Sequence, residues 1–208
     1  MDDFVNKLPV DEDPGDIYGG LRPEMARIMN SIRDDLESFR EDMKNRSLDD
    51  PIDRIFSRIK DEDSMREKLE SRGLPVTVRA ALTEVEDAIG IRVVCPFVND
   101  VYMVRDYLSG RRDPEVVSET DHIKDPCENG YRSLHLILKA ENRFFAEVQI
   151  RTVTMDIWAN LENSMLYLHD IGANTDVIEK ELKRCADDLA SAEGSLQSIR
   201  DMIGQASC

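Results

Sequence analysis

Three polar side chains alternate with apolar ones in the segment 146–151, and their types could do chemistry. They are a carboxylate, an amide and a guanidinium: Glu147, Gln149 and Arg151. Successive residues of a β-strand point to opposite faces, so one face of this strand enters a core and the other presents the three groups in a row. Such a face suits a nucleotide site, and a purely structural strand does not need it.

A second alternating segment precedes this strand. Asn129-Gly130 is a turn signal, and the run 133–139 that follows has a leucine at every second position. The polar run 140–143 separates the two segments, which predicts an antiparallel hairpin. In that hairpin His135 shares a face with the three polar groups. Tyr131, beside the turn, is either a platform for a purine base or an aromatic that shields the core.

A spaced basic set lies earlier in the chain, at Arg58, Lys60, Ser64 and Lys68. On a helix, the last three would share one face at steps of four residues. Two ammonium groups and a hydroxyl in a row suit a triphosphate, although a solvated basic face gives the same pattern. The acidic run 61–63 fits a cap for the following helix, and it would weaken phosphate binding if it faced the site.

A carboxylate and a guanidinium flank a glycine in Asp87, Gly90 and Arg92. Taken alone, an aspartate before a strand is usually a turn residue. Together with Glu147 it offers two carboxylates, which suit magnesium when phosphate oxygens complete the coordination. Glu147 is also the natural general base for an attacking hydroxyl.

Together these motifs resemble the synthetase domain of RelA/SpoT-homology proteins, and more closely the short, single-domain small alarmone synthetases. The resemblance runs from about Arg58 to about Tyr167. It implies an α+β fold with a small mixed sheet flanked by helices, like that of nucleotidyltransferases. It also implies an enzyme that uses Mg²⁺ to transfer pyrophosphate from ATP to the 3′-hydroxyl of GDP or GTP.

The resemblance also implies roles for single residues. Lys60, Ser64 and Lys68 would hold the ATP phosphates, while Arg58 and Arg92 would stack on adenine. Asp87 and Glu147 would bind magnesium. The acceptor nucleotide would contact the following residues: Lys124, Asn129, Tyr131, Arg132, His135, Gln149 and Arg151.

The chain departs from the family pattern at three positions. The family usually has a second lysine after the segment 124–126, where this chain has Cys127. In the helix after the second hairpin strand, histidine is replaced by Asn163 and lysine by Leu168. Each change removes a positive or protonatable group, so the acceptor is open: GDP or GTP, another nucleotide, or the tRNA 3′ end as in the toxic branch of the family. A weakly active nucleotide-binding regulator is the alternative of a different class.

Composition limits the partners. The chain has 208 residues, 43 acidic and 27 basic, and a net charge of −16. Such a charge argues against binding DNA, RNA or anionic lipid through bulk electrostatics. No secretory signal or apolar run of membrane-spanning length is present, and the four cysteines lack metal or disulfide spacing, so we expect a cytoplasmic protein with reduced thiols.

The elements that must position these residues follow from periodicity and turn signals. We expect an acidic, flexible segment over 1–20, a synthetase domain over 21–170 and a separate helix over 171–208. Within the domain the predicted helices are 25–43, 52–59, 64–69, 101–108 and 152–168, and the predicted strands are 91–95 (central), 116–117 and the two strands of the hairpin.

The last segment carries a heptad pattern. From Ile178 to Ile203, apolar residues recur in steps of four and three, with Leu182, Leu189 and Leu196 in one heptad position. The stripe would be buried against the helix 25–43 or against another subunit. Since the small alarmone synthetases are oligomers, we expect a homo-oligomer.

Overall fold

The computed structural model describes residues 6, 8, 15–46, 49–168 and 175–206, and its centre is a five-stranded mixed sheet. The strand order is β1-β2-β5-β4-β3, with β2 and β5 parallel and the other neighbours antiparallel. The mixed α+β fold predicted from the sequence is therefore confirmed. The middle strand of the five is β5. Strand β2, which was expected to be central, lies between β1 and β5. The strands are β1 (Arg54–Ile59), β2 (Ile89–Cys95), β3 (Glu115–Asp121), β4 (Leu134–Ala140) and β5 (Phe144–Thr152).

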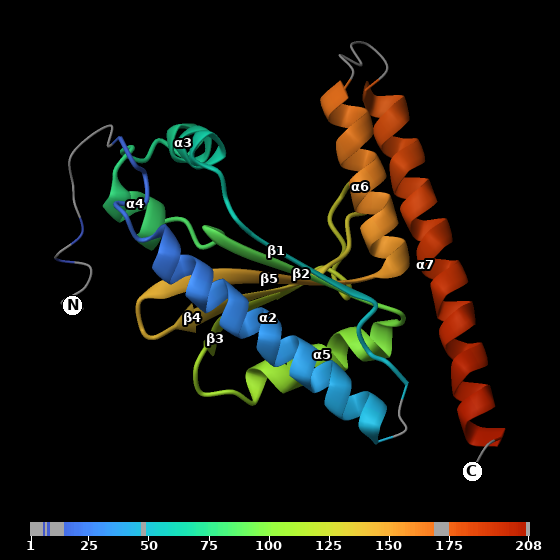
Figure 1. Cartoon of the computed structure of the whole chain (residues 1–208). Coiled ribbons are helices and arrows are strands. Elements are labelled where there is room, and N and C mark those ends of the chain that lie inside the picture. Colours follow the sequence, from blue (N-terminus) through green and yellow to red (C-terminus); the bar gives the residue numbers. More distant parts are fainter. Residues whose placement is uncertain (1–5, 7, 9–14, 47–48, 169–174, 207–208) are drawn as a thin grey trace.

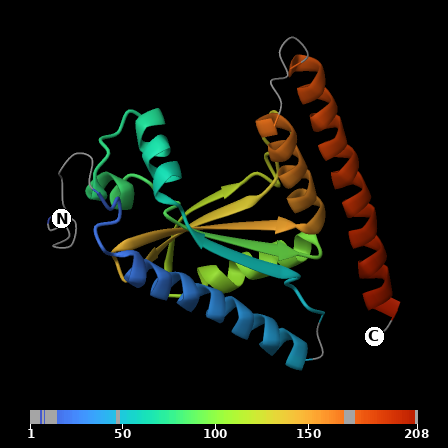
Figure 2. The same ribbon diagram turned by 45° about the horizontal axis from the view of Figure 1, so that its top comes forward.

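The two faces of the sheet differ because the strands alternate. One face is apolar and is covered by α2 (Arg22–Asn45) and α5 (Val98–Ser109), which lie on the same side of the sheet in Figures 1 and 2. Figure 2 shows α3 and α6 on the other side, at opposite ends. The polar face between them is left accessible. As predicted, α2 buries one apolar stripe, formed by Met25, Ile28, Ile32 and Leu36.

The prediction of a helix over residues 52–59 is wrong, because residues 54–59 form strand β1. Its apolar residues fit helical spacing, but Ile55 and Ile59 also fit a period of two. Antiparallel pairing with β2 decides the outcome, because it places Ile55 and Ile59 against the core and Arg58 on the polar face. Short apolar runs are ambiguous in this way when read alone.

The predicted hairpin is confirmed as β4 and β5, and a tight turn closes it. Glu141 and Asn142 have φ angles of 51° and 54°, and the Arg143 N–H donates to the Ala140 carbonyl at 2.9 Å. Two central residues with positive φ are typical of a type I′ turn, whose twist matches that of paired strands. The turn fixes the register in which His135 lies opposite Gln149.

Two short helices lie between β1 and β2 in the chain. The predicted helix 64–69 is α3 (Glu62–Ser71), and the Asp61 carboxylate caps it by accepting from the Ser64 N–H at 2.9 Å. A further helix, α4 (Val78–Thr83), was not anticipated. Most of the segment 1–20, expected to be flexible, lies outside the described residues. At its end, however, Ile17 and Tyr18 are fully buried in the core.

The chain ends in two helices, α6 (Val153–Leu168) and α7 (Thr175–Ala206), which lie side by side in both views. The first half of α7 packs on α6 rather than on α2, with Leu182, Ala186 and Leu189 around Trp158. Farther along, α7 turns polar residues inward, and Leu196 of the heptad stripe is 55% exposed. No helix in the described part of the chain is long and apolar enough to cross a membrane.

Candidate active site

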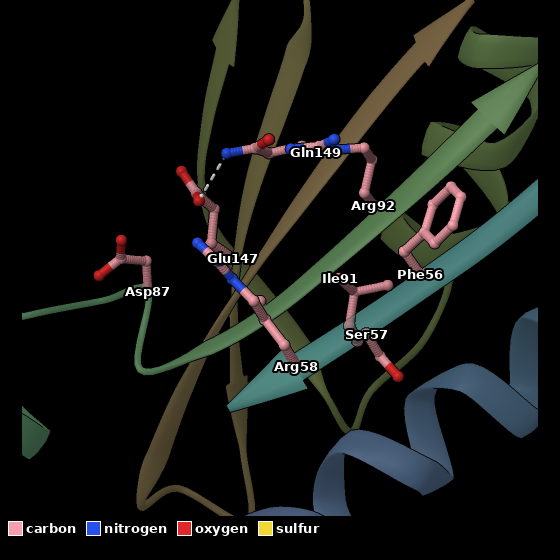
Figure 3. A pocket seen from close by; sticks show the side chains of 9 residues that line it. Phe56, Ser57, Arg58, Asp87, Ile91, Arg92, Glu147 and Gln149 are labelled. Carbon is pink, nitrogen blue, oxygen red and sulfur yellow. Dashed lines mark hydrogen bonds between the residues drawn. The ribbon is translucent and has the colours of Figure 1, made fainter. Parts of the chain in front are cut away.

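The polar face of the sheet carries a pocket of about 320 Å³ between β1, β2 and β5. Figure 3 shows Arg58, Arg92, Glu147 and Gln149 on one side of these strands and Asp87 on the loop that leads into β2, while Ser57 and Ile91 point to the other side. The register explains the grouping, because Gly90 lies opposite both Arg58 and Glu147, and Arg92 lies opposite Gln149. The pocket is lined by Phe56, Ser57, Arg58, Asp87, Gly90, Ile91, Arg92, Glu147 and Gln149.

One side of the pocket is a carboxylate held by two lysines. The Oδ2 atom of Asp87 lies 3.0 Å from Lys60 Nζ and 2.6 Å from Lys68 Nζ. Burial raises the pKa of Asp87, but the hydrogen bonds from Lys68 and Lys60 outweigh it, and the pKa lies below its ordinary value. The predicted helical row is wrong in one respect, because Lys60 follows β1 and precedes α3. The two lysines still converge, through Asp87.

The opposite wall is Glu147, which has two hydrogen-bond partners. Its Oε1 atom lies 3.1 Å from His135 Nδ1, and its Oε2 atom accepts from Gln149 Nε2 at 2.9 Å. Burial raises the pKa of Glu147. The hydrogen bond and charge of His135 and the hydrogen bond of Gln149 together lower it by more, so the pKa lies below its ordinary value. The carboxylate is therefore ionised at neutral pH and able to accept a proton.

The row continues beyond the pocket to Tyr131. Arg151 donates to Gln149 Oε1 at 2.9 Å and to Tyr131 Oη at 2.6 Å, and its guanidinium lies 5.1 Å from the centre of the Tyr131 ring. The Tyr131 hydroxyl also lies 2.9 Å from His135 Nε2. The predicted polar face of the hairpin is thus one hydrogen-bonded network.

The two arginines assigned to adenine both line the pocket. Arg58 comes from β1 and Arg92 from β2, beside the half-exposed ring of Phe56. Burial lowers the pKa of Arg92, and the neighbouring Arg151 guanidinium lowers it further. A flat guanidinium and an aromatic ring at the mouth of a pocket are groups on which a planar base can stack.

Four predicted site residues have other described contacts. The Ser64 N–H donates to Asp61, and Lys124 Nζ lies 3.1 Å from Asp121 and over the Tyr102 ring. The Asn129 side chain donates to Glu162 and accepts from the Tyr131 N–H, so it shapes the turn. Arg132 donates to the Gly130 carbonyl and to Asp187 of α7. None of these contacts places the four residues in the pocket; Asn129 instead holds the backbone of Tyr131, and Arg132 ties the turn to α7.

Six residues at the site were not predicted from the sequence: the pocket-lining Phe56, Ser57, Gly90 and Ile91, and Asp156 and Asn160 on α6. Phe56 was assigned to a helix, which hid its place beside Arg92. Asp156 was detectable in principle, because it is a carboxylate within the buried face of the helix 152–168. Buried carboxylates are almost always paired, so a cationic partner could have been sought.

Comparison with known proteins places the chain in a family. Residues 57–171 match the model of the region found in RelA / SpoT proteins, and this match spans β1 to the segment after α6. The chain belongs to this family of nucleotide-binding pyrophosphokinases and is of the small alarmone synthetase kind.

Named relatives and a solved structure support the same family assignment. GTP pyrophosphokinase YwaC of Bacillus subtilis is 37% identical over 147 residues, which are 66% of this chain and 68% of that protein. YjbM of the same organism is 29% identical over 163 residues, 75% of each chain. The crystal structure of small alarmone synthetase 1 from Bacillus subtilis, bound to its product pppGpp, matches with a TM-score of 0.78 and 27% identity, covering 88% of this chain and 96% of that one.

Proposed function

We propose that this protein transfers pyrophosphate from ATP to the 3′-hydroxyl of GDP or GTP, which forms (p)ppGpp and releases AMP. The observation that carries the proposal is the shared pocket, in which Glu147 faces a lysine-held carboxylate, Asp87, and two arginines. Its relatives are named GTP pyrophosphokinases. A mere nucleotide-binding regulator would not need a half-buried carboxylate base at the centre of the sheet.

The donor half of the pocket binds ATP through charge. Lys60 and Lys68 converge at its edge and supply the positive charge that the phosphates require, while Arg58 and Arg92 stack on adenine. Phosphoryl-type transfer depends mainly on positioning and on neutralising charge. This half therefore fixes the β-phosphorus relative to Glu147.

The acceptor half lies on the hairpin. Tyr131 stacks on the guanine base, and His135, Gln149 and Arg151 contact the sugar and phosphates. Glu147 takes the proton of the 3′-hydroxyl as that oxygen bonds to the β-phosphorus of ATP. The bond between the β-phosphorus and the oxygen that bridges to the α-phosphorus breaks, and AMP leaves with that oxygen.

Magnesium fits the donor set. The Oδ1 atom of Asp87 is buried and has no hydrogen-bond partner among the described residues. Asp87 and Glu147 line the same pocket, and magnesium prefers one or two protein carboxylates with phosphate and water oxygens completing its shell. When bound, the ion would neutralise charge on the transferred phosphates.

The assay that tests the function uses labelled ATP and magnesium with GDP, GTP, GMP, ADP or tRNA in turn. The position of Cys127 lacks a family lysine, and its thiol instead lies 3.5 Å from His122, whose ring contacts those of Tyr131 and His135. With one charge fewer for the acceptor phosphates, we expect GDP to gain label at least as well as GTP. Label on tRNA or ADP alone would show the different acceptor of the toxic branch.

Replacing Tyr131 tests the acceptor platform. Tyr131→Ala should raise the KM for the acceptor by about tenfold, since stacking of a base on an aromatic ring contributes about 1–3 kcal/mol. The KM for ATP should change little. Arg58→Ala is the matched variant in the donor half and should raise the KM for ATP instead. If Tyr131→Ala lowers only the melting temperature, the tyrosine is a packing residue.

The C-terminal helix supports a homo-oligomer. Only the first half of the apolar stripe of α7 is covered by α6, while Leu196, Ile199 and Met202 are 48–61% exposed. Monomers seldom expose contiguous apolar stripes on a long helix. We therefore infer that a second subunit covers this part of α7.

Charged residues in the exposed part of the stripe test this assembly. Leu196→Asp with Ile199→Asp should give a smaller particle by light scattering with an unchanged melting temperature of the monomer, because both side chains face solvent within one chain. Leu189→Asp is the contrasting variant, since Leu189 packs against Trp158 and its loss should destabilise α6 and α7. An unchanged particle mass in the double variant would contradict assembly through this stripe.

A further inference from the structure

One buried carboxylate lies between the two halves of the site. Asp156 on α6 has its Oδ1 atom 3.3 Å from Arg92 NH1 and 3.5 Å from Arg151 NH1. Arg92 belongs to the donor pocket on β2, whereas Arg151 supports Tyr131 on the hairpin. A single side chain thus contacts one arginine from each half.

The charges explain why a carboxylate is needed here. The side chains of Asp156 and Arg151 are 6% and 5% exposed, and that of Arg92 is 35% exposed. Two guanidinium groups so close together repel each other, and burial weakens the screening by water. Asp156 offsets this repulsion and lets both arginines remain beside the pocket.

Asn160 completes the arrangement one helical turn farther along α6. Its Nδ2 atom donates to Asp156 Oδ2 at 3.1 Å, and its Oδ1 atom accepts from Arg92 NH1 at 3.2 Å. The same terminal nitrogen of Arg92 is therefore held by two neighbouring groups of one helix. This restrains the end of its guanidinium, and a restrained guanidinium is better placed to stack on a base.

Arg151 is held in a similar way on its other edge. It donates to Gln149 and Tyr131, and its Nε atom donates to Ser133 Oγ at 3.4 Å. An unbroken path of contacts therefore runs from Arg92 through Asp156 and Arg151 to Tyr131. The two ends of the path are the side chains proposed to stack on the two bases.

We propose that Asp156 is a positioning residue for both substrates, which orients Arg92 for the donor and Arg151 with Tyr131 for the acceptor. This rests on the proposed function, because the two halves are defined by it. Asp156 touches no reacting atom. Its loss weakens the binding of both nucleotides, whereas the loss of Asn160 weakens mainly the binding of the donor, because Asn160 bonds directly to Arg92 and is linked to Arg151 through Asp156.

The test measures binding of each nucleotide separately by calorimetry. The donor probe is an ATP analogue with a methylene bridge between the α- and β-phosphorus atoms, and the acceptor probe is GDP. Asp156→Asn should weaken the binding of both by about tenfold or more, because the amide can still accept a hydrogen bond but no longer carries the charge that offsets the two arginines. Asn160→Ala should weaken mainly the binding of the ATP analogue, by about two- to tenfold.

Trp158→Phe is the matched control on the same helix. It removes the hydrogen bond from Trp158 Nε1 to the Leu182 carbonyl, 2.9 Å long, and among the described residues Trp158 forms no hydrogen bond with either arginine. We expect a lower melting temperature and an unchanged affinity for the ATP analogue; the acceptor is the less strict readout, because Tyr131 packs against the cluster that contains Trp158. If this control weakens both nucleotides as Asp156→Asn does, Asp156 acts only through the stability of α6 and the proposal is overturned.

The remaining outcomes also decide. An Asp156→Asn protein that loses affinity for one nucleotide only, or for neither, overturns the proposal. If Asp156→Asn does not fold, Asn160→Ala decides alone: unchanged affinity for the ATP analogue overturns the proposal, and a selective loss supports it. If the wild type labels no guanine nucleotide but Asp156→Asn still weakens both probes, the proposed reaction fails while the positioning role stands.

Discussion

Glu147→Gln is expected to lower pyrophosphate transfer by about 10²–10⁴-fold, the usual contribution of a positioned general base. The amide keeps the shape of the carboxylate and the hydrogen-bonding reach to His135 and Gln149, but it cannot accept the proton of the attacking hydroxyl. The rate of label transfer from ATP to GDP in a single turnover measures the loss.

Binding separates this effect from a damaged pocket. The affinity of Glu147→Gln for the ATP analogue should be within a few-fold of wild type when magnesium is absent. Gln149→Glu in the Glu147→Gln background is a useful companion variant. It places a carboxylate two residues away on the same face of β5, and so tests whether the position of the base matters. Near-wild-type turnover in Glu147→Gln would falsify the assignment of the base.

The second large effect is expected at Asp87. Asp87→Asn should lower turnover by about 10²-fold or more and raise the magnesium concentration that gives half of the maximal rate, since one of two candidate carboxylate ligands is removed. Lys60 and Lys68 also lose their shared anionic partner, so phosphate binding in the absence of magnesium should not weaken. Magnesium titrations of the steady-state rate provide the measurement.

Asp61→Asn is the control for Asp87. Asp61 directly follows Lys60 in the chain, but it caps α3 from an exposed position. Asparagine caps a helix equally well. Its magnesium dependence should equal that of wild type. If Asp87→Asn shows the same magnesium dependence as Asp61→Asn, the carboxylate serves the lysines and does not bind the metal.

The face of the hairpin could be predicted from the sequence for a physical reason. A strand with one buried side must alternate, so the apolar positions around Val148 dictate that Glu147 and Gln149 share the opposite face. The Asn129-Gly130 turn, which starts the motif, also has a local signature. At Gly130 the φ angle is 94°, and an added Cβ would lie 2.7 Å from the Cβ of Ala186. Only glycine fits both demands.

Other parts depend on contacts that no local pattern contains. Residues 54–59 satisfy both a helical and a strand period, and only pairing with β2 selects the strand. Lys60 and Lys68 meet because β1 ends where α3 begins, and not because they share a helix. The position of Asp156 between two arginines depends on residues that lie 64 and five positions before it, on two different strands.

The α7 stripe shows a different limit. The heptad positions are apolar throughout, yet only those near Leu182 and Leu189 pack within the chain. Beyond them, Glu193 and Arg200 face inward, toward Thr154 and Asp100. Periodicity indicates that a face is to be buried, but it does not specify the occupant.

The turn at Glu141 and Asn142 gives the active site a dependence that lies outside the site itself. This turn sets which residue of β5 lies opposite which residue of β4. A slip of one residue would rotate Glu147 into the apolar layer and bring Val148 to the pocket, with every amino acid unchanged. Competence for catalysis is therefore a property of strand alignment. The left-handed backbone of Glu141 and Asn142 therefore determines which side chains of β5 reach the pocket.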